Sequence, residues 1–299
     1  MYYLSAFFYY FLLIPISRLP FGVLYAIADG LSWLFFNVVG YRKQVVVENI
    51  RNSFPEKSEA EIQQIARDFY THLCTLIIET VKAFSMTRAE FMQRVSFTGL
   101  DLLDHYAKQG KSIIIAAGHC HNYEWLVTGI DPLVKHKVMA LYRPLNNRFF
   151  DEKIKQSRSK LGLNLASIYE IKSQFGEQVV EQPVAAAFAM DQSPSNPESA
   201  YWMQFLNQDT PILFGTEKYA KEYDLPVVFG HIHSKKRGYY YANFELLTET
   251  PRETAYGEIT EKMMKWLEAD IRQEPATWLW SHKRWKHKRT TAQSPLSEG

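Results

Sequence analysis

A histidine and a glutamate follow a mostly apolar run in the first half of the chain. The run 112–117 ends at Gly118, and His119 and Glu124 come soon after it. Two residues five apart on one helix lie about 140° apart around its axis and cannot meet. They can meet if His119 lies in a loop and Glu124 in the first turn of the next helix, where the helix dipole keeps a carboxylate ionised. This arrangement predicts a general base, because the carboxylate holds one ring nitrogen of His119 and the other can take up a proton.

No nucleophile on the protein accompanies this pair. We therefore expect a hydroxyl of the substrate to be the nucleophile, with His119 as its base. Cys120 is interpreted as a small filler of the loop, because a nucleophilic thiol needs the base aimed at it. Together with Cys120, the histidines at 119, 121, 231 and 233 are ligand types that suit zinc. Each extended segment offers two ligands at best and nothing in the sequence sets the two segments face to face, so we predict no metal site.

Apolar, β-rich runs alternate with helical segments over most of the chain. This alternation predicts an α/β fold with a mostly parallel central sheet flanked by helices, in which ligands bind beyond the carboxyl ends of the strands. The expected strands cover 112–117, 138–142, 184–190, 227–232 and 239–246. The expected helices cover 59–84, 122–130, 146–161, 171–181, 212–223 and 254–272.

Polar residues follow the next two expected strands and so lie at the same edge of the sheet as His119. Arg143 is a forked donor that suits a phosphate or a carboxylate, and Asn146 can bond a sugar hydroxyl or fix the loop. Asp191 can orient Arg143, bind a sugar hydroxyl, or cap the segment that follows it. These side chains are candidates for substrate binding.

The composition excludes several classes of protein. The chain has 299 residues, 46% of them hydrophobic, which is ample for a packed core and excludes disorder as the main state. Its net charge of +2 shows that the chain as a whole is no polyanion binder. With only two cysteines, the chain is not a disulfide-dense secreted scaffold and cannot form a four-cysteine zinc site.

The first 41 residues have the composition of a membrane segment. They are rich in Tyr, Phe and Trp, and up to residue 40 only Arg18 and Asp29 are charged. We interpret segment 1–41 as a membrane anchor, either a short span or an interfacial hairpin, with Arg18, Arg42 and Lys43 on the cytoplasmic side. A helical hairpin buried against its own domain is the alternative. A signal peptide is disfavoured, because no basic region precedes the run and no cleavage site follows it.

The remainder divides into a catalytic domain, 42–289, and a polar tail, 290–299. The end of the domain is basic and aromatic. We expect its side chains to contact lipid headgroups or an acidic carrier protein, and a solvated basic tail is the alternative. Nucleic acid is excluded as a partner, because the basic run is short and lies at the opposite end of the chain from a membrane anchor. The expected contacts are Trp278, Trp280, Lys283, Arg284 and Trp285.

An ordered set of motifs between Tyr41 and Lys288 resembles one known family. That family is the lipid A biosynthesis (lauroyl/myristoyl) acyltransferases of Gram-negative bacteria, within the lysophospholipid acyltransferase superfamily. The matching residues are Tyr41-Arg42, Asn49-Ile50-Arg51, Phe54-Pro55-Glu56, His119 with Glu124, Tyr142-Arg143-Pro144 with Asn146, Met190-Asp191-Gln192, and the segment 275–280 with His282, Arg284 and Trp285.

The resemblance implies a membrane-associated O-acyltransferase with a glycerolipid acyltransferase-like fold. His119 would be the base and Glu124 its orienter, with Arg143, Asn146, Asp191 and Gln192 binding substrate. The donor would be the thioester of an acyl carrier protein or of CoA, so that neither a cofactor nor a metal is needed. The acceptor would be a hydroxyl of a lipid A precursor at the bacterial inner membrane, with the catalytic domain on its cytoplasmic side.

Other functions remain open at this point. The chain could acylate another glycolipid or an aminolipid, act as a lipid hydrolase in which the histidine activates water, or bind lipid without catalysis. For a transferase we expect an apolar groove beside His119 that holds the acyl chain.

Overall fold

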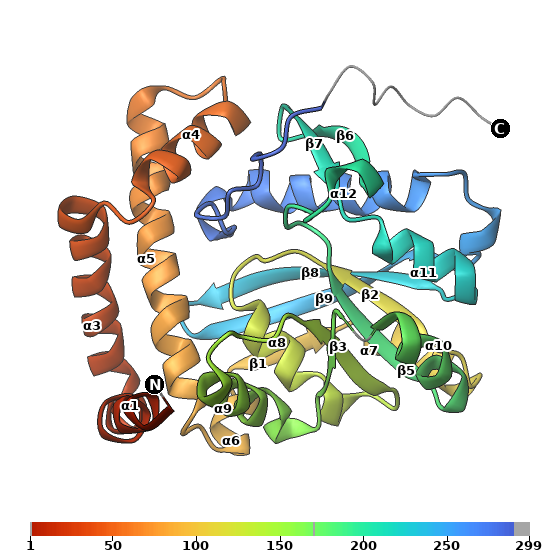
Figure 1. Cartoon of the computed structure of the whole chain (residues 1–299), viewed down its shortest axis with the longest axis horizontal. Helices are drawn as coiled ribbons and strands as arrows, with labels where there is room; N and C mark the ends of the chain where they lie inside the picture. Colours follow the sequence, from red (N-terminus) through yellow and green to blue (C-terminus); the bar gives the residue numbers. More distant parts are fainter. Residues whose placement is uncertain (1, 170, 290–299) are drawn as a thin grey trace.

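A seven-stranded sheet forms the centre of the molecule among the residues that the computed structural model describes, 2–169 and 171–289. All neighbouring strands in it are parallel except β8 and β9, which form an antiparallel hairpin (Figure 1). The predicted α/β class with a mostly parallel sheet is therefore confirmed. The polar tail expected over 290–299 lies outside the described residues. The strands run in the order β1 (Val95–Thr98), β9 (Tyr239–Thr248), β8 (Val227–Lys236), β2 (Ile113–Ala117), β5 (Val184–Ala189), β3 (Lys137–Tyr142) and β4 (Asn164–Ser167).

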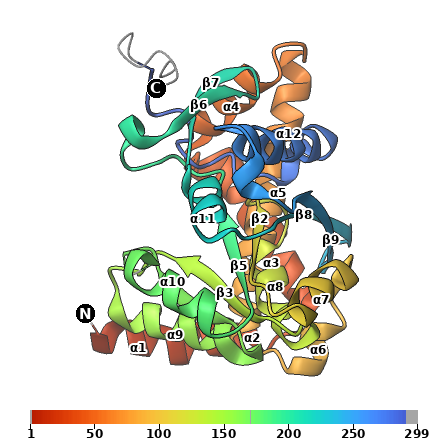
Figure 2. The same cartoon turned by 90° about the vertical axis from the view of Figure 1, so that its right-hand side faces the viewer.

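Helices cover both faces of this sheet, as its apolar central strands require. Helices α7 (Leu100–Lys108) and α8 (Tyr123–Gly129) pack on one face, and α11 (Gly215–Tyr223) and α12 (Glu258–Gln273) pack on the other (Figures 1 and 2). The remaining elements of this part of the chain are α6 (Arg88–Met92), α9 (Arg148–Arg158), α10 (Ile171–Glu181), the antiparallel hairpin β6 (Tyr201–Phe205) and β7 (Gln208–Ile212), and 3₁₀ turns at Asp131–Leu133, Ser159–Leu161, Pro197–Ser199, Pro251–Glu253 and Pro275–Thr277.

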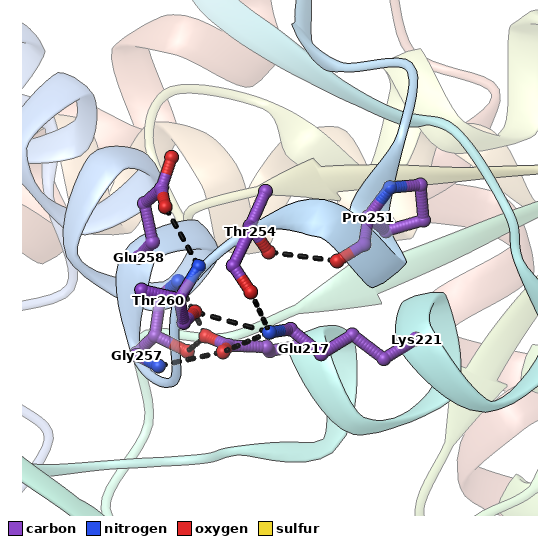
Figure 3. Close-up of polar contacts among 8 residues, drawn as sticks. Glu217, Lys221, Pro251, Thr254, Gly257, Glu258 and Thr260 are labelled. Carbon is purple, nitrogen blue, oxygen red and sulfur yellow. Dashed lines mark hydrogen bonds and ion pairs between the residues drawn. The ribbon is translucent and has the colours of Figure 1, made fainter.

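A buried carboxylate ties α11 to the start of α12. The Glu217 side chain on α11 is fully buried and accepts hydrogen bonds from the backbone N–H of Gly257, at 2.6 Å, and of Thr260, at 2.9 Å (Figure 3). The hydroxyl of Thr260 donates a third bond, at 2.7 Å. Because the first N–H groups of a helix have no partner within the helix, Glu217 serves as a cap supplied by a different element.

The N-terminal region is helical throughout and lies along one side of the molecule. It comprises α1 (Tyr2–Phe8), a π-helical stretch (Tyr9–Leu13), α2 (Ile14–Ser17), α3 (Phe21–Leu34) with a π-helical end (Phe35–Val39), α4 (Lys43–Ser53) and the long α5 (Glu59–Ala83). Helix α5 begins at a capping box, in which Ser58 and Glu61 satisfy each other's backbone N–H groups.

Helix α3 runs beside α5 and buries only one of its faces there (Figure 1). Leu24 and Ala28 of α3 pack on Cys74 and Ile78 of α5 in a small apolar cluster. The continuous helix Phe21–Val39 is, by length and composition, apolar enough to cross a membrane, and most of it is not buried. One face of α3 is therefore buried against the protein, as the alternative of a buried hairpin expects, and the rest of the helix is not.

Candidate active site

His119 is held by the carboxylate of Asp191, at the carboxyl edge of the sheet. Its Nδ1 lies 2.6 Å from Oδ1 of Asp191, and its backbone N–H donates to Oδ2 at 2.8 Å. The indole N–H of Trp278 donates to the same Oδ2 at 2.7 Å. The Asp191 side chain is almost fully buried, whereas that of His119 is 13% exposed. A buried carboxylate thus orients an imidazole that solvent can still reach.

The strand register explains this contact between residues 72 positions apart. Strands β2 and β5 are parallel neighbours, and their last paired residues are Ala117 and Ala189. His119 and Asp191 each stand two residues beyond that pair. Since successive residues of a strand alternate between faces, equal offsets direct the two side chains to the same side.

The two groups stabilise each other's charged forms. Burial raises the pKa of Asp191, but the charge of His119 and the hydrogen bonds from His119 and Trp278 outweigh it and hold this pKa well below its usual range. Burial lowers the pKa of His119, and the Asp191 carboxylate outweighs this effect, so that the pKa of His119 is raised. Glu124 adds a smaller upward effect and Arg158 a downward one.

These contacts leave Nε2 of His119 as the basic nitrogen. An ionised carboxylate can only accept, so Nδ1 of His119 donates to Asp191, and in a neutral imidazole the other nitrogen then carries the lone pair. The side-chain amide of Gln192 lies 3.1 Å from Nε2, and the ring of Tyr123 packs edge-on against the imidazole. Gln192 occupies the position that a hydroxyl would need in order to give up its proton to Nε2.

Glu124 does not hold His119, and the expectation that it accepts the ring proton is wrong. It begins α8, as predicted, but its carboxylate pairs with the guanidinium of Arg158 at the end of α9, with Nε of Arg158 2.7 Å from Oε2. A forked guanidinium matches a carboxylate in two parallel hydrogen bonds, which fixes Glu124 toward α9. Asp191 meanwhile fills the position beside Nδ1 of His119. The side chains of Glu124 and Arg158 remain 19% and 27% exposed.

Arg143 and Asn146 lie in the loop after β3, at the same edge of the sheet, and both are exposed. The next residue, Asn147, caps α9 with its side chain. The structure thus leaves Arg143 and Asn146 accessible to a substrate without joining them to the dyad of His119 and Asp191. Their roles stay predictions.

The expected surface contact at the end of the domain is wrong for three of its five residues. Trp278, Trp280 and Arg284 are buried. Each of these side chains donates a hydrogen bond to a group inside the protein. The indole of Trp278 donates to Asp191, that of Trp280 to the carbonyl of Pro275, and Nη2 of Arg284 to the carbonyl of Pro211. Lys283 is exposed, and half-buried Trp285 donates to the hydroxyl of Thr210.

Cys120 is buried beside the dyad, and its backbone forms an isolated bridge with Trp278. Burial raises the pKa of its thiol well above the usual value, and the nearby carboxylates of Asp191, Asp270 and Glu274 add to this. A thiol in that state is a poor nucleophile, which agrees with the interpretation of Cys120 as a filler.

The structure brings His121 and His233, from the two histidine segments, to the same carboxylate. The expectation that the two segments do not meet is therefore wrong for these two residues. Glu274, at the end of α12, lies 3.4 Å from Nε2 of His121 and 3.3 Å from Nδ1 of His233. Strand β8 is the parallel neighbour of β2 and extends beyond it, so His233 stands beside the loop that carries His121.

Two buried or half-buried groups at this edge escaped sequence reasoning. Arg158 lies at the end of an expected helix, where a basic residue reads as an ordinary helix terminus. Glu79 is buried in α5, and its carboxylate accepts from Tyr25 at 2.9 Å, Asn122 at 2.6 Å and Tyr240 at 2.8 Å. The sequence signal for Glu79 was its position beside the apolar stripe of α5, which predicts a buried carboxylate. A buried carboxylate needs several hydrogen-bond donors around it.

Comparisons with known proteins show which family and relatives the chain resembles. The model of the family described as bacterial lipid A biosynthesis acyltransferase matches residues 1–287. The chain is similar to the lipid A biosynthesis palmitoleoyltransferase of Escherichia coli (strain K12), with 22% identity over 273 residues that cover 90% of this chain and 87% of the relative. It is also similar to the lipid A biosynthesis acyltransferase of Haemophilus influenzae, with 22% identity over 275 residues covering 90% of this chain and 86% of the relative.

Proposed function

The chain belongs to the bacterial lipid A biosynthesis acyltransferase family and is an acyltransferase, and from this premise we propose that it acylates a hydroxyl of a lipid A precursor with His119 as the general base. The observation that carries the proposal is the dyad of His119 and Asp191, which lies at the carboxyl edge of the sheet with the basic Nε2 turned away from Asp191, toward Gln192. An acyl transfer to a hydroxyl needs such a base.

In the proposed reaction the acceptor hydroxyl displaces the Gln192 amide from Nε2 of His119. Nε2 takes the hydroxyl proton while the oxygen attacks the carbonyl carbon of a thioester. The tetrahedral intermediate collapses by breaking the carbon–sulfur bond, and the leaving thiolate takes the proton back from His119. Asp191 fixes the orientation of the ring throughout and stabilises the imidazolium that forms between the two steps.

Glu124 and Arg158 have a supporting role in this proposal. Glu124 occupies Nε and Nη2 of Arg158 and fixes the direction of the guanidinium. The same guanidinium is partly exposed, so it can offer its remaining donors to a phosphate of the acceptor or to the developing oxyanion. Arg143, which is exposed at the same edge, is the second candidate for a phosphate contact.

The donor is proposed to be an acyl thioester of acyl carrier protein or of CoA. A thioester is already activated, so the chemistry requires no further cofactor and no catalytic metal. Lys283 and its exposed basic neighbours Lys286 and Lys288 suit the acidic surface of a carrier protein. The apolar groove for the acyl chain stays part of the proposal.

Membrane association is proposed to run through segment 2–41. Most of the large apolar side chains that the described part of the chain exposes lie in this segment, Tyr3, Phe7, Phe11 and Trp33 among them. Since α3 packs lengthwise on α5, we propose that these helices lie in the membrane interface and bring the catalytic edge to the lipid surface at the cytoplasmic side of the inner membrane.

The decisive experiment incubates the purified protein with an acyl carrier thioester, with and without a lipid A precursor, and follows both thiol release and acylated lipid. Transfer requires acceptor-dependent thiol release, whereas a hydrolase releases thiol at the full rate from donor alone. His119→Ala should lower kcat/KM by roughly 10²- to 10⁴-fold, the usual contribution of a positioned base. His105→Ala, an exposed histidine on α7, is the matched control and should leave the rate unchanged. Normal transfer by the His119 variant would overturn the proposal.

A further inference from the structure

Three metal-ligand side chains meet on the far side of the loop that carries His119. They are His121 in the loop, His233 on β8 and Glu274 after the last turn of α12. One ligand atom from each lies within 4.8 Å of the other two. His121 is 3% exposed, and the side chains of His233 and Glu274 are 16% and 34% exposed. The protein therefore encloses most of the cluster, and solvent reaches it at His233 and Glu274.

The spacing of these atoms suits a tetrahedral ion. Zinc binds imidazole nitrogen and carboxylate oxygen at about 2.0–2.2 Å, so two ligands of one tetrahedral ion stand roughly 3.3–3.5 Å apart. Oε2 of Glu274 lies 3.4 Å from Nε2 of His121, and its other oxygen, Oε1, lies 3.3 Å from Nδ1 of His233. Two imidazoles with one carboxylate are a donor set of intermediate softness, which favours a divalent transition metal over calcium or magnesium.

A neighbouring pair on the same two elements shows what a simple structural contact looks like here. His231, two residues before His233 on β8, lies 2.9 Å from both oxygens of Asp270, four residues before Glu274. Asp270 thus serves one imidazole through both of its oxygens. Glu274 instead offers one oxygen to each of two imidazoles. Only the second arrangement leaves a position between three ligands.

A third imidazole lies against the cluster. The ring of His72 on α5 packs edge-on against that of His121, with centroids 6.0 Å apart. The cluster is thus closed by another ring on the side of α5.

We propose that His121, His233 and Glu274 bind a divalent transition metal ion, with zinc as the best fit. The ion joins the loop after β2 to β8 and to the end of α12. His119 precedes His121 by two residues, so the ion fixes the far side of the loop while Asp191 fixes the near side. Its role is to hold the loop in position, because the dyad itself uses no metal. The inference does not depend on the identity of the acyl donor or acceptor.

The test measures metal binding by the purified full-length protein after chelator treatment. Zinc content after dialysis against zinc should reach one ion per chain, and Co²⁺ should give the visible absorption of a tetrahedral complex. His233→Ala and Glu274→Gln should each lose the stoichiometric ion and the Co²⁺ spectrum. His231→Ala, on the same strand and with its own carboxylate, is the matched control and should retain both.

A second measurement guards against variants that merely unfold. Added zinc should raise the thermal unfolding temperature of the wild type and of His231→Ala, and leave that of Glu274→Gln unchanged. The proposal is overturned if the folded wild type gives no Co²⁺ spectrum and no stoichiometric zinc. It is equally overturned if His231→Ala loses binding as completely as His233→Ala, because the histidines of β8 would then bind metal without the geometry of the cluster.

Discussion

At the scale of single residues, one carboxylate organises the carboxyl edge of the sheet around His119. Asp191 receives the ring N–H and the backbone N–H of His119 and the indole N–H of Trp278. Three donors on two oxygens fix the carboxylate in place and leave it ionised. The orientation of the imidazole therefore follows from backbone positions as well as from a side-chain contact.

Asp191→Asn should shift the pH dependence of transfer. The wild-type carboxylate raises the pKa of His119, and only the neutral ring can act as a base. As the pH falls through this raised pKa, wild-type kcat/KM should fall. In the variant that pKa is lower, so the acid limb should move to lower pH, while the plateau drops by roughly 100-fold or more because the ring loses its orienter. Rates are measured from pH 5 to 9, and an unmoved acid limb would contradict the assignment.

Arg158→Lys should separate guanidinium geometry from charge. Lysine keeps the positive charge but cannot pair with both oxygens of Glu124 in a planar fork. We expect kcat/KM to fall roughly 10- to 100-fold, as when a reacting group is misplaced, with the fold retained in circular dichroism spectra. Arg148→Lys is the control, because Arg148 is exposed on the same helix and should tolerate the change. Equal activity of wild type and Arg158→Lys would remove Arg158 from the site.

The sequence placed His119 and Asp191 at the same edge of the sheet, but paired His119 with the wrong acid. Glu124 is close in sequence, and spacing arguments favour close residues. Asp191 becomes the partner only because β5 is the neighbour of β2, and strand order does not follow from the order of runs along the chain. The same limit hid the meeting of His121 with His233, which depends on β8 pairing with β2 on its other side.

At the scale of elements, side chains of other helices fix the starts of α8 and α12. Asn122, the N-cap of α8, accepts a hydrogen bond from the backbone N–H of Trp125 and donates one to buried Glu79 of α5. The loop that carries His119 is thereby fixed to a helix of the N-terminal half. In the same way, Glu217 of α11 caps α12.

Glu217→Ala should destabilise the fold and leave the contact between His119 and Asp191 unchanged. It leaves the buried N–H groups of Gly257 and Thr260 unpaired, and each lost partner of this kind costs about 1–3 kcal/mol. We expect the free energy of unfolding to fall by about 3 kcal/mol in urea titrations. Glu258→Ala is the control, because Glu258 is exposed and caps only Ala255, and its effect should stay below about 1 kcal/mol. Equal losses in the two variants would refute the capping role of Glu217.

Strands formed by continuous apolar runs were predictable from the sequence, whereas β8 and β9 extend four and two residues beyond the expected runs 227–232 and 239–246, and the shortest strands were missed. The runs at 112–117, 138–142 and 184–190 are continuous and apolar, and the strands β2, β3 and β5 lie at them within one residue. Strands β1 and β4 have four residues each and too little pattern to show a period. Strand β7 contains Pro211, which argues against a strand in a sequence and is accommodated here in a two-stranded hairpin.

At the scale of the whole molecule, apolar surface is concentrated on the N-terminal helices. Phe7 and Phe11 are 61% and 70% exposed and stack on each other. Most of the apolar side chains that a soluble protein exposes are scattered, whereas a concentrated set indicates an interaction surface. This arrangement supports the proposed attachment to a bilayer through one side of the molecule.

Replacing Phe7 and Phe11 together by Ser should weaken binding to phospholipid vesicles. Transfer of two aromatic side chains out of water is worth about 3 kcal/mol at least, so partitioning should fall by roughly 100-fold in vesicle flotation. The control replaces Val180 and Tyr256, which are equally exposed apolar residues away from the N-terminal helices. Undiminished flotation of the Phe7 and Phe11 variant would show that attachment occurs elsewhere.

The bond from Trp278 to Asp191 has a consequence for biosynthesis. Ribosomes extend a chain from its amino end, so Trp278 is added 87 residues after Asp191. Until then Asp191 lacks one of its three donors, and the bridge between Trp278 and Cys120 cannot form. A nascent chain that has not yet reached Trp278 therefore holds the imidazole of His119 through a carboxylate that is only partly fixed.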